Sequence, residues 1–590
     1  DNDCDGAIDE DFDLTEATSC GSCENDCTDG AENAQMECVG AQCVVAACDL
    51  GFQDSDRDPS NGCECNGAVE DEPDPDFIDS DCDGLDGSLG GAIFVHPNGN
   101  DANNVGSADQ PMRTIEAAVL LAQRLEPAFD RIYISEGNFR LGEFVEINGE
   151  RVLFEIPDGF RLHGGFRRAP NRVDWSRHPR AEARTIIYGS QVALRFSNLS
   201  SHTMIDNLEL RALDSANQTP SSSVGVFAKN VGQHLHLRDV LVRSGRGGDG
   251  VNGSDGRDGF QGGRLGSNGV ERGGGSGGEA RLCEGSVLSA GSGGDGGLPG
   301  RMGESGGVPL DNMPSAPGGM PGQDDIARNG IDGADGESGA NGSHGRADGQ
   351  IGEDGLWVPA NAGDGAPGMA GSGGGGGAGL QDVQIPECSA GGGGGGGGGC
   401  PGTLGTGGNG GFGSIGLLVM GGSVRLENVE IVTDEAGDGG DGGDGGSGVV
   451  GGDGGLGASY PAACPRGPLR AGRGGDGGDG SCGGHGAGAA GGPSISILRV
   501  APRLGAMARS SVVFVDRDGA PLPDQAAAAT DQLSFGAAGA AGDGGHGNGC
   551  DPEAPAGRPG VAVRIGCCHA GPGGGPCGGR DGEELTCVLQ

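Results

Sequence analysis

The sequence predicts an all-β solenoid that is interrupted by glycine-rich inserts, and two observations carry this prediction. A pattern of a buried strand, a turn and an alternating strand recurs along the chain. The recurrences are residues 223–242, 414–432 and 494–515. Each is followed by glycines, at Gly245, Gly437 and Gly536, as expected of a repeat with inserts of unequal length at one corner. The inserts span about 245–412, 436–492 and 536–560.

The spacing of the glycines predicts the structure of the inserts. Glycine makes up 134 of the 590 residues and occupies every third position over 294–306 and 330–345. Three residues per turn is the period of polyproline II, a helix without internal hydrogen bonds. The first insert would extend about 500 Å as a single rod at about 3.1 Å per residue, so we expect it to fold back into short polyglycine-II-type helices. Backbone hydrogen bonds between these helices would hold them together.

Two other structures are open to such a composition. A disordered linker is the usual state of glycine-rich sequence. A collagen triple helix requires long uninterrupted triplets rich in proline, whereas these runs change register after five or six triplets.

The charge of the chain excludes some partners. With 37 basic and 84 acidic side chains, the net charge is -47, which disfavours binding to nucleic acids and to anionic membranes. The single lysine, Lys229, precedes Asn230, so no glycine run is a phosphate-binding P-loop. The sequence contains no run long and apolar enough to span a membrane. We also expect the chain to be a mature or trimmed product whose export signal lies upstream, because it begins inside an Asp-rich motif.

The even number of cysteines predicts disulfides formed in an oxidising compartment. A zinc site at Cys20, Cys23 and Cys27 is the alternative, and it lacks a second ligand pair. We therefore expect an extracellular or cell-surface protein. The candidate disulfide residues are Cys4, Cys20, Cys23, Cys27, Cys38, Cys43, Cys48, Cys63, Cys65, Cys82, Cys283, Cys388, Cys400, Cys464, Cys482, Cys550, Cys567, Cys568, Cys577 and Cys587.

Residues 1–88 form an Asp- and Cys-rich segment with the pattern of a calcium-binding loop. Alternating carboxylates followed by a glycine surround a hard cation with oxygen ligands. The first loop departs from an EF-hand, because Phe12 stands where a bidentate glutamate is expected. A solvated acidic linker is the alternative, but so few apolar residues leave little else to order the segment. The candidate ligands are Asp1, Asp3, Asp5, Asp9, Asp54, Asp56, Asp58, Asp79, Asp81 and Asp83.

The motif Asp81-Cys82-Asp83-Gly84, together with 48–52 and 58–64, resembles the Asp-Cys-Asp-Gly metal-binding repeats of secreted myxobacterial-type proteins. This resemblance implies an extracellular segment that holds calcium between disulfides.

Residues 91–245 carry a second resemblance. A strand at 93–95 leads into a helix that ends near Leu125, with one apolar face, and strands follow at 131–135 and 160–166. The apolar face consists of Ile115, Ala118, Val119 and Ala122. This order resembles the start of the right-handed parallel β-helix, or pectin-lyase-like, family. The resemblance implies a parallel β-helix over 89–590, with a Cys-rich terminus at 561–590.

The family includes polysaccharide lyases and hydrolases, and a few residues of this sequence belong to types that could carry such chemistry. Histidine stands between glycines at His485 and His546, as in some hydrolases of this fold, but the other parts of that signature are absent. The run 516–518, Asp-Arg-Asp, is interpreted first as a turn, and only second as a site that binds a sugar acid. His234 and His236 alternate along a strand. We interpret them first as solvent-facing side chains, and only second as metal ligands. The sequence therefore predicts a protein that is not an enzyme.

Together these observations predict a secreted structural protein, a calcium-stabilised subunit of an extracellular fibre. Its expected partner is another copy of the same chain. The alternative is a monomeric adhesin that binds surface glycans or polysaccharide. A polysaccharide lyase or hydrolase ranks third.

Overall fold

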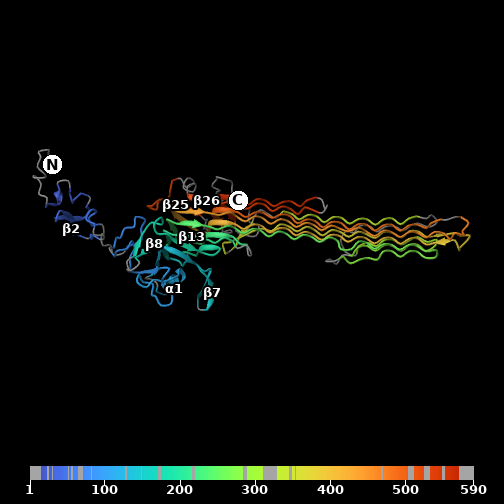
Figure 1. The fold of residues 1–590 in the computed structure, drawn as a ribbon, viewed down its shortest axis with the longest axis horizontal. Helices are drawn as coiled ribbons and strands as arrows, with labels where there is room; N and C mark the ends of the chain where they lie inside the picture. The colour runs from blue at the N-terminus through green and yellow to red at the C-terminus, as the bar shows by residue number, and fades with distance from the viewer. Residues whose placement is uncertain are drawn as a thin grey trace.

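A computed structural model gives the fold of the protein (Figure 1). It describes residues 15–22, 25–29, 31–50, 52–54, 58–63, 71–81, 83–125, 129–147, 149–169, 175–215, 220–283, 289–309, 328–344, 349–352, 354–466, 469–501, 511–523, 532–547 and 552–569. Over these residues the protein is all-β, with one α-helix, α1 (Ile115–Leu125), and one short 3-10 helix, η1 (Ala17–Ser19).

Three parallel sheets form the body of the molecule. The first joins β3 (Ala92–Val95), β4 (Arg131–Ser135), β8 (Arg161–Arg168), β12 (Thr203–Asp206), β15 (Leu235–Arg238), β22 (Ser423–Glu427) and β25 (Ser511–Val515), and the antiparallel β9 (Trp175–Arg177) pairs with β8. The second joins β5 (Gly137–Arg140), β10 (Thr185–Tyr188), β13 (Glu209–Arg211), β16 (Leu241–Arg243), β23 (Glu430–Val432) and β26 (Leu533–Ser534). The third joins β11 (Val192–Ser197), β14 (Ser223–Lys229), β21 (Ser414–Met420), β24 (Ser494–Ala501) and β27 (Ala562–His569).

The chain visits these sheets in a fixed order. After β10 it passes from the third sheet to the first and then to the second, and each further passage adds one strand to each sheet. The pairings follow the repeats seen in the sequence: Leu237 lies opposite Leu426, and Val242 lies opposite Ile431. The repeated strand patterns are therefore neighbours in space, residue for residue.

The core lies between the sheets. It contains the inward side chains of the strands, such as Ile132, Leu237 and Leu426, which are fully buried. Full burial of an aliphatic side chain of this size is worth about 1.5–3 kcal/mol. Helix α1 covers one end of this core with the four apolar residues of its predicted face, all of which are buried.

Residues 234–242 and 423–432 differ from the single strands that the alternation predicts. One residue with a positive φ divides each of them, Asp239 (φ 53°) in the first and Asn428 (φ 47°) in the second. The short polar side chains of Asn and Asp tolerate this left-handed conformation, and it turns the chain from one sheet into the next. Because the two positions lie next to each other, the side-chain amide of Asn428 donates a hydrogen bond to the carboxylate of Asp239.

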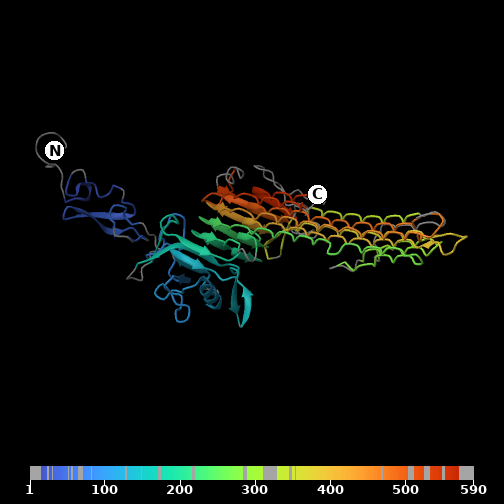
Figure 2. The same ribbon diagram turned by 45° about the vertical axis from the view of Figure 1, so that its right-hand side comes forward.

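The three glycine-rich inserts follow β16, β23 and β26 and return at β21, β24 and β27, always from the second sheet to the third. In Figures 1 and 2 their segments run side by side away from the sheets as one straight array. We call the described residues of 245–309, 328–344, 359–412, 433–492 and 535–560 the glycine bundle. Its only paired strands among the described residues are β19 (Leu380–Gln381) and β20 (Ser389–Ala390).

Three antiparallel hairpin strand pairs complete the fold. They are β1 (Ala34–Val39) with β2 (Gln42–Cys48), β6 (Phe144–Ile147) with β7 (Glu150–Leu153), and β17 (Gln350–Ile351) with β18 (Trp357–Val358). The β1–β2 hairpin lies at the end of the molecule opposite the glycine bundle (Figure 1).

Candidate functional site

Hydrogen bonds every third residue hold the glycine bundle together. The amides of Gly250, Gly253 and Gly256 donate to the carbonyls of Asp438, Asp441 and Asp444, at 2.7, 2.7 and 2.6 Å. The bonds join segments far apart in the sequence. Apart from the short β19–β20 pair, the described residues of the bundle form no ladder of the kind found in a sheet. A period of three is the one that the glycine spacing predicts.

The run 391–399 lies at the centre of the bundle. Its amides donate in rotation to three different segments: Gly394 to Ser267, Gly395 to Gly294 and Gly396 to Gly475, at 3.0, 2.8 and 2.9 Å. Its carbonyls accept from three further segments, through the amides of Gly377, Gly455 and Gly278. Six segments therefore surround this run. Its amides donate to three of them, and its carbonyls accept from the other three.

The six neighbouring segments explain why residues 391–399 are nine uninterrupted glycines. A Cβ atom added at any of these residues except Gly397 would lie 1.7–2.1 Å from a backbone carbonyl oxygen. At Gly397 the nearest atom would be the Glu279 carbonyl oxygen, 3.3 Å away, so the neighbouring segment stands farther from the run at this residue. Only glycine fits where a segment has neighbours on every side.

Segments at the edge of the bundle have fewer neighbours and contain fewer glycines. Over 250–259, glycine remains at the one position in three that faces the bundle, and other residues occupy the outward positions. Gly488 and Gly491 face the carbonyls of Gly542 and Gly539. Where the 536–547 segment has ended, side chains such as Asp479 take the equivalent positions. The glycine pattern thus reports how many neighbours a segment has.

Aspartates and asparagines of the bundle have a structural role. Asp249, Asn252 and Asp255 accept hydrogen bonds through their side chains from the amides of Asp438, Asp441 and Asp444, at 3.0, 2.9 and 2.9 Å. Asp438 in turn accepts from the amide of Ala540 at 2.7 Å. These side chains satisfy backbone amides at the edges, where no neighbouring carbonyl is available.

Disulfides are present both in the bundle and in the N-terminal hairpin. Cys283–Cys400 and Cys388–Cys464 cross-link the bundle, and Cys20–Cys38, Cys27–Cys43 and Cys48–Cys63 staple the hairpin. Cys482 is also disulfide-bonded. The zinc alternative fails, because Cys20 and Cys27 are committed to disulfides. Cys567 and Cys568 lie in β27, and the remaining candidates, Cys4, Cys23, Cys65, Cys82, Cys550, Cys577 and Cys587, fall outside the described residues.

The candidate metal centre lies in residues 71–89. Carboxylate oxygens of Asp71, Asp79 and Asp81 lie within 4.8 Å of one another. Asp79 and Asp81 belong to the predicted set, whereas Asp71 was missed, since it lies eight residues before Asp79 and is brought close by folding of the segment. Three carboxylates at this separation form a donor set that suits a hard cation such as calcium.

The other predicted ligands stand apart from this group. Asp83 accepts from the backbone amides of Leu85 and Leu89, and burial, with repulsion from the neighbouring aspartates, raises its pKa to about 6. Asp58 accepts from the amide and the hydroxyl of Ser60. Asp54 and Asp58 join no group of three candidate ligands among the described residues. Asp1, Asp3, Asp5, Asp9 and Asp56 fall outside those residues.

Arginines of the first sheet anchor this acidic segment. Glu72 pairs with Arg131 and Arg161, and the Pro73 carbonyl accepts from Arg238 at 2.6 Å. Leu85 packs onto an aromatic cluster on the outer face of the sheet, which consists of Phe94, Tyr133, Phe166 and Trp175. The segment therefore lies across the first sheet as a fixed cover.

Beneath the cover lies a buried charge cluster. Arg177 donates to Asp86 at 2.6 Å and also to Asp206, and Arg238 donates to Asp206 at 2.9 and 3.0 Å. Burial alone would raise the pKa of Asp206. The charge of Arg177 and the hydrogen bonds from His163 and Arg238 outweigh burial and hold this pKa far below its ordinary value. Burial lowers the pKa of His163. Burial raises the pKa of Asp86 to about 7 despite its pair with Arg177, so the net charge of the cluster depends on the protonation of both Asp86 and His163.

The remaining candidates for chemistry have structural environments. His485 is 1% exposed, and its Nδ1 accepts from the amide of Gly445 at 3.0 Å inside the bundle. The Asp516 carboxylate accepts from the amide of Ala520 and closes a turn. His236 is buried, with its Nε2 atom 3.2 Å from Glu427, whereas the alternation predicts a solvent-facing side chain. A polar hollow at the edge of the first sheet is lined by Asp130, Asp158, Gly159, Phe160, Arg161, Ser201 and His202.

Among the described residues, no helix has both the length and the apolar character needed to cross a membrane. The chain matches no protein-family model, no curated protein and no solved structure.

Proposed function

We propose that this chain is a secreted, non-enzymatic structural protein of the cell surface, in which a right-handed parallel β-helix carries a stiff rod of polyglycine-II-type helices. The order in which the chain visits its three sheets supports the β-helix, because each circuit adds one strand to each sheet. The hydrogen bonds at every third residue support the helices of the rod.

One observation carries the mechanical role, the complete surrounding of residues 391–399 by six other segments. A flexible glycine linker exposes its backbone to water, whereas this run bonds to its neighbours in every direction. Each such bond contributes about 1 kcal/mol net, and many of them connect the segments. The bundle extends about 70 Å for the 22 residues of 391–412, at about 3.1 Å per residue. It is therefore suited to hold two points apart rather than to bind a small molecule.

The disulfides and the net charge of -47 favour an extracellular location. Calcium fits the carboxylates of Asp71, Asp79 and Asp81, which would hold the ion. When bound, it would neutralise charge within the acidic cover and fix the cover on the first sheet. Aspartates of the bundle, in contrast, already serve backbone amides.

We further propose that copies associate into a fibre. Direct stacking of the sheets would need an open end, and the end at β3 is covered. Helix α1 covers the core there, and Phe94 exchanges backbone hydrogen bonds with Gly106 and Met112 at 2.7 and 2.8 Å. Closure of such an edge prevents strand addition. Association is therefore proposed through other surfaces.

A monomeric adhesin that binds polysaccharide is the second candidate. The polar hollow beside Arg161 and His202 favours it, because ionic and hydroxyl-bearing side chains suit a sugar. The environments of His485 and Asp516 support a function without catalysis, since both are engaged with backbone amides.

Electron microscopy of the purified full chain, in calcium and then in EGTA, tests these alternatives. Fibres with a regular axial repeat support the structural subunit, and their loss in EGTA shows that association depends on calcium. Single particles with one straight projection in both conditions support the monomeric adhesin. Particles without a straight projection contradict the stiff rod itself.

A further inference from the structure

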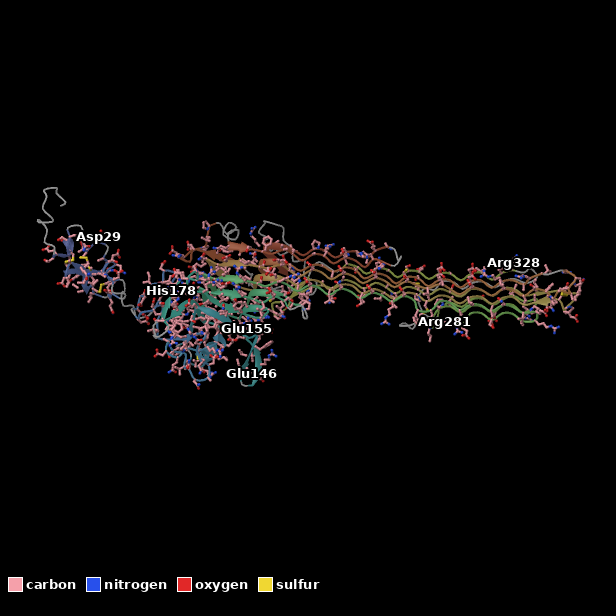
Figure 3. The ribbon with its side chains drawn as sticks, in the orientation of Figure 1. Asp29, Glu146, Glu155, His178, Arg281 and Arg328 are labelled. Atoms are coloured by element: carbon pink, nitrogen blue, oxygen red, sulfur yellow. A yellow bond between two sulfur atoms is a disulfide. The ribbon has the colours of Figure 1, made fainter. Side chains whose placement is uncertain are left out.

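One edge of the glycine bundle differs from the rest of its surface. The described residues of 246–309 form this edge, which lies along the lower side of the bundle in Figures 1 and 2. We call it the 246–309 flank. Figure 3 shows Arg281 on this flank and Arg328 at the opposite, upper edge.

Large apolar side chains are exposed along the 246–309 flank. Phe260 is 72% exposed and Leu282 is 78% exposed, and six others are more than half exposed. The full set is Val251, Phe260, Leu265, Val270, Leu282, Leu298, Met302 and Val308. Single exposed apolar residues are ordinary, but a set that belongs to one edge marks an interaction surface.

The charge of this flank is also unusual for the chain. The described residues of 246–309 contain six arginines and seven carboxylates. Residues 433–458, the segment to which the amides of Gly250 and Gly253 donate, contain six carboxylates and no basic residue. On the flank the two signs are interspersed, as in the Arg264–Glu279 pair at 2.8 Å. The flank is thus nearly neutral in a protein whose net charge is -47.

We propose that the 246–309 flank is the surface through which two copies of this chain associate. Two bodies that each carry a large negative charge repel one another, and the repulsion is smallest where the facing surfaces are nearly neutral. Interspersed charges of both signs can pair across such an interface, and burial of the apolar side chains supplies the driving force. The proposal names the surface for the self-association proposed above and rests on it.

The flank is large enough for a stable contact. Residues 246–270 extend over about 75 Å at about 3.1 Å per residue. A strip about 10 Å wide along them covers roughly 800 Å², which is the area that each partner buries in a standard interface. A rod that contacts its copy along this length would be held parallel or antiparallel to it.

Sedimentation velocity of the full chain in calcium tests the proposal. The test variant combines Phe260→Asp and Leu298→Asp, which add two charges at exposed apolar positions of the flank. The control is Ile331→Asp, which changes a side chain that is 54% exposed on the 328–344 segment, the segment that begins at Arg328 on the opposite edge. We expect the wild type and the control to associate with equal affinity, and the test variant to associate at least tenfold more weakly.

The outcomes separate the flank from the wider proposal. Unchanged association of the test variant, with association of the wild type intact, overturns the flank and leaves the fibre subunit standing. Equal weakening by the control also overturns the flank. A wild type that remains monomeric up to about 0.1 mM removes self-association altogether. Flotation of the wild type, but not of the test variant, with phosphatidylcholine vesicles would assign the flank to a lipid surface instead. Circular dichroism and protease resistance of all variants confirm that the fold is retained.

Discussion

Gly396 faces the carbonyl oxygen of Gly452 so closely that an added Cβ atom would lie 1.7 Å from it. A Cβ atom added instead at the next residue, Gly397, would have its nearest neighbour, the Glu279 carbonyl oxygen, at 3.3 Å. These two neighbouring glycines therefore offer a matched test of the packing in the bundle.

We expect Gly396→Ala to destabilise the bundle by about 1–3 kcal/mol, because the segments must move apart to admit the methyl group. Gly397→Ala should change stability by less than about 0.5 kcal/mol, since restriction of the unfolded chain offsets the tighter contact. Limited proteolysis against temperature, followed by mass spectrometry of cleavage within 391–412, measures both. Equal behaviour of the two variants would contradict the six-segment surrounding.

Arg177 joins Asp86 of the acidic cover to Asp206 of the first sheet. Its removal leaves two carboxylates buried without this partner, and loss of one partner from a buried pair costs about 3–5 kcal/mol. We therefore expect Arg177→Ala to release residues 71–89 to protease and to lower the free energy of unfolding. Arg517→Ala breaks the exposed pair with Asp76 and should cost less than about 1 kcal/mol. Denaturant unfolding of both variants gives the comparison.

His163 makes the cluster sensitive to pH. Its side chain is fully buried, with Nδ1 2.9 Å from Asp206, and burial lowers its pKa from the ordinary 6.5. The folded protein then binds fewer protons at this site than the unfolded chain. Stability from this residue is therefore present above about pH 6.5 and is lost as the pH falls below it.

The measurement compares the pH dependence of the free energy of unfolding between the wild type and two histidine variants. The free energy of unfolding of the wild type should fall more steeply between about pH 7.5 and about pH 5 than that of His163→Gln. The exposed His344 supplies the control, and His344→Gln should keep the wild-type slope. A slope that His163→Gln leaves unchanged would show that this histidine does not titrate on unfolding.

Calcium should protect the acidic cover. We expect EGTA to increase cleavage within residues 1–88 while the three sheets and the bundle remain intact, because the ion holds carboxylates that otherwise repel one another. Asp79→Asn with Asp81→Asn should abolish the protection, and Asp453→Asn on the bundle should leave it unchanged. Protection that is independent of calcium would remove the metal from the account.

Much of the fold follows from residues that the sequence displays directly. The face of α1 is read from Ile115, Ala118, Val119 and Ala122, and the repeats pair in the register that alignment of 234–242 with 423–432 predicts. The division of these strands at Asp239 and Asn428 does not follow from the alternation, because Asp and Asn tolerate a positive φ without requiring it.

The arrangement of the bundle and the metal centre depended on the structure. The period of glycine predicts polyglycine-type segments, but the identity of their neighbours depends on where each segment turns. The run 391–399 contains the relevant signal, since only a surrounded segment requires glycine at all three positions of the period. Asp71 carried no such signal, because it joins Asp79 and Asp81 only through the fold of the cover.

The hydrogen bonds at every third residue restrict how this protein can change in length during evolution. Side chains and amides pair at fixed offsets, as in Asp249 with Asp438 and Asp255 with Asp444, so a deletion of one residue in an inner segment would misplace every later bond. Lengthening is expected in triplets, each adding about 9 Å, and in all contacting segments together. A single extra residue is tolerated at an edge: between Gly259, bonded to Ser447, and Gly263, bonded to Val450, four residues of one segment span three of its neighbour. Related chains should therefore differ by multiples of three within 391–412 and by single residues near Phe260.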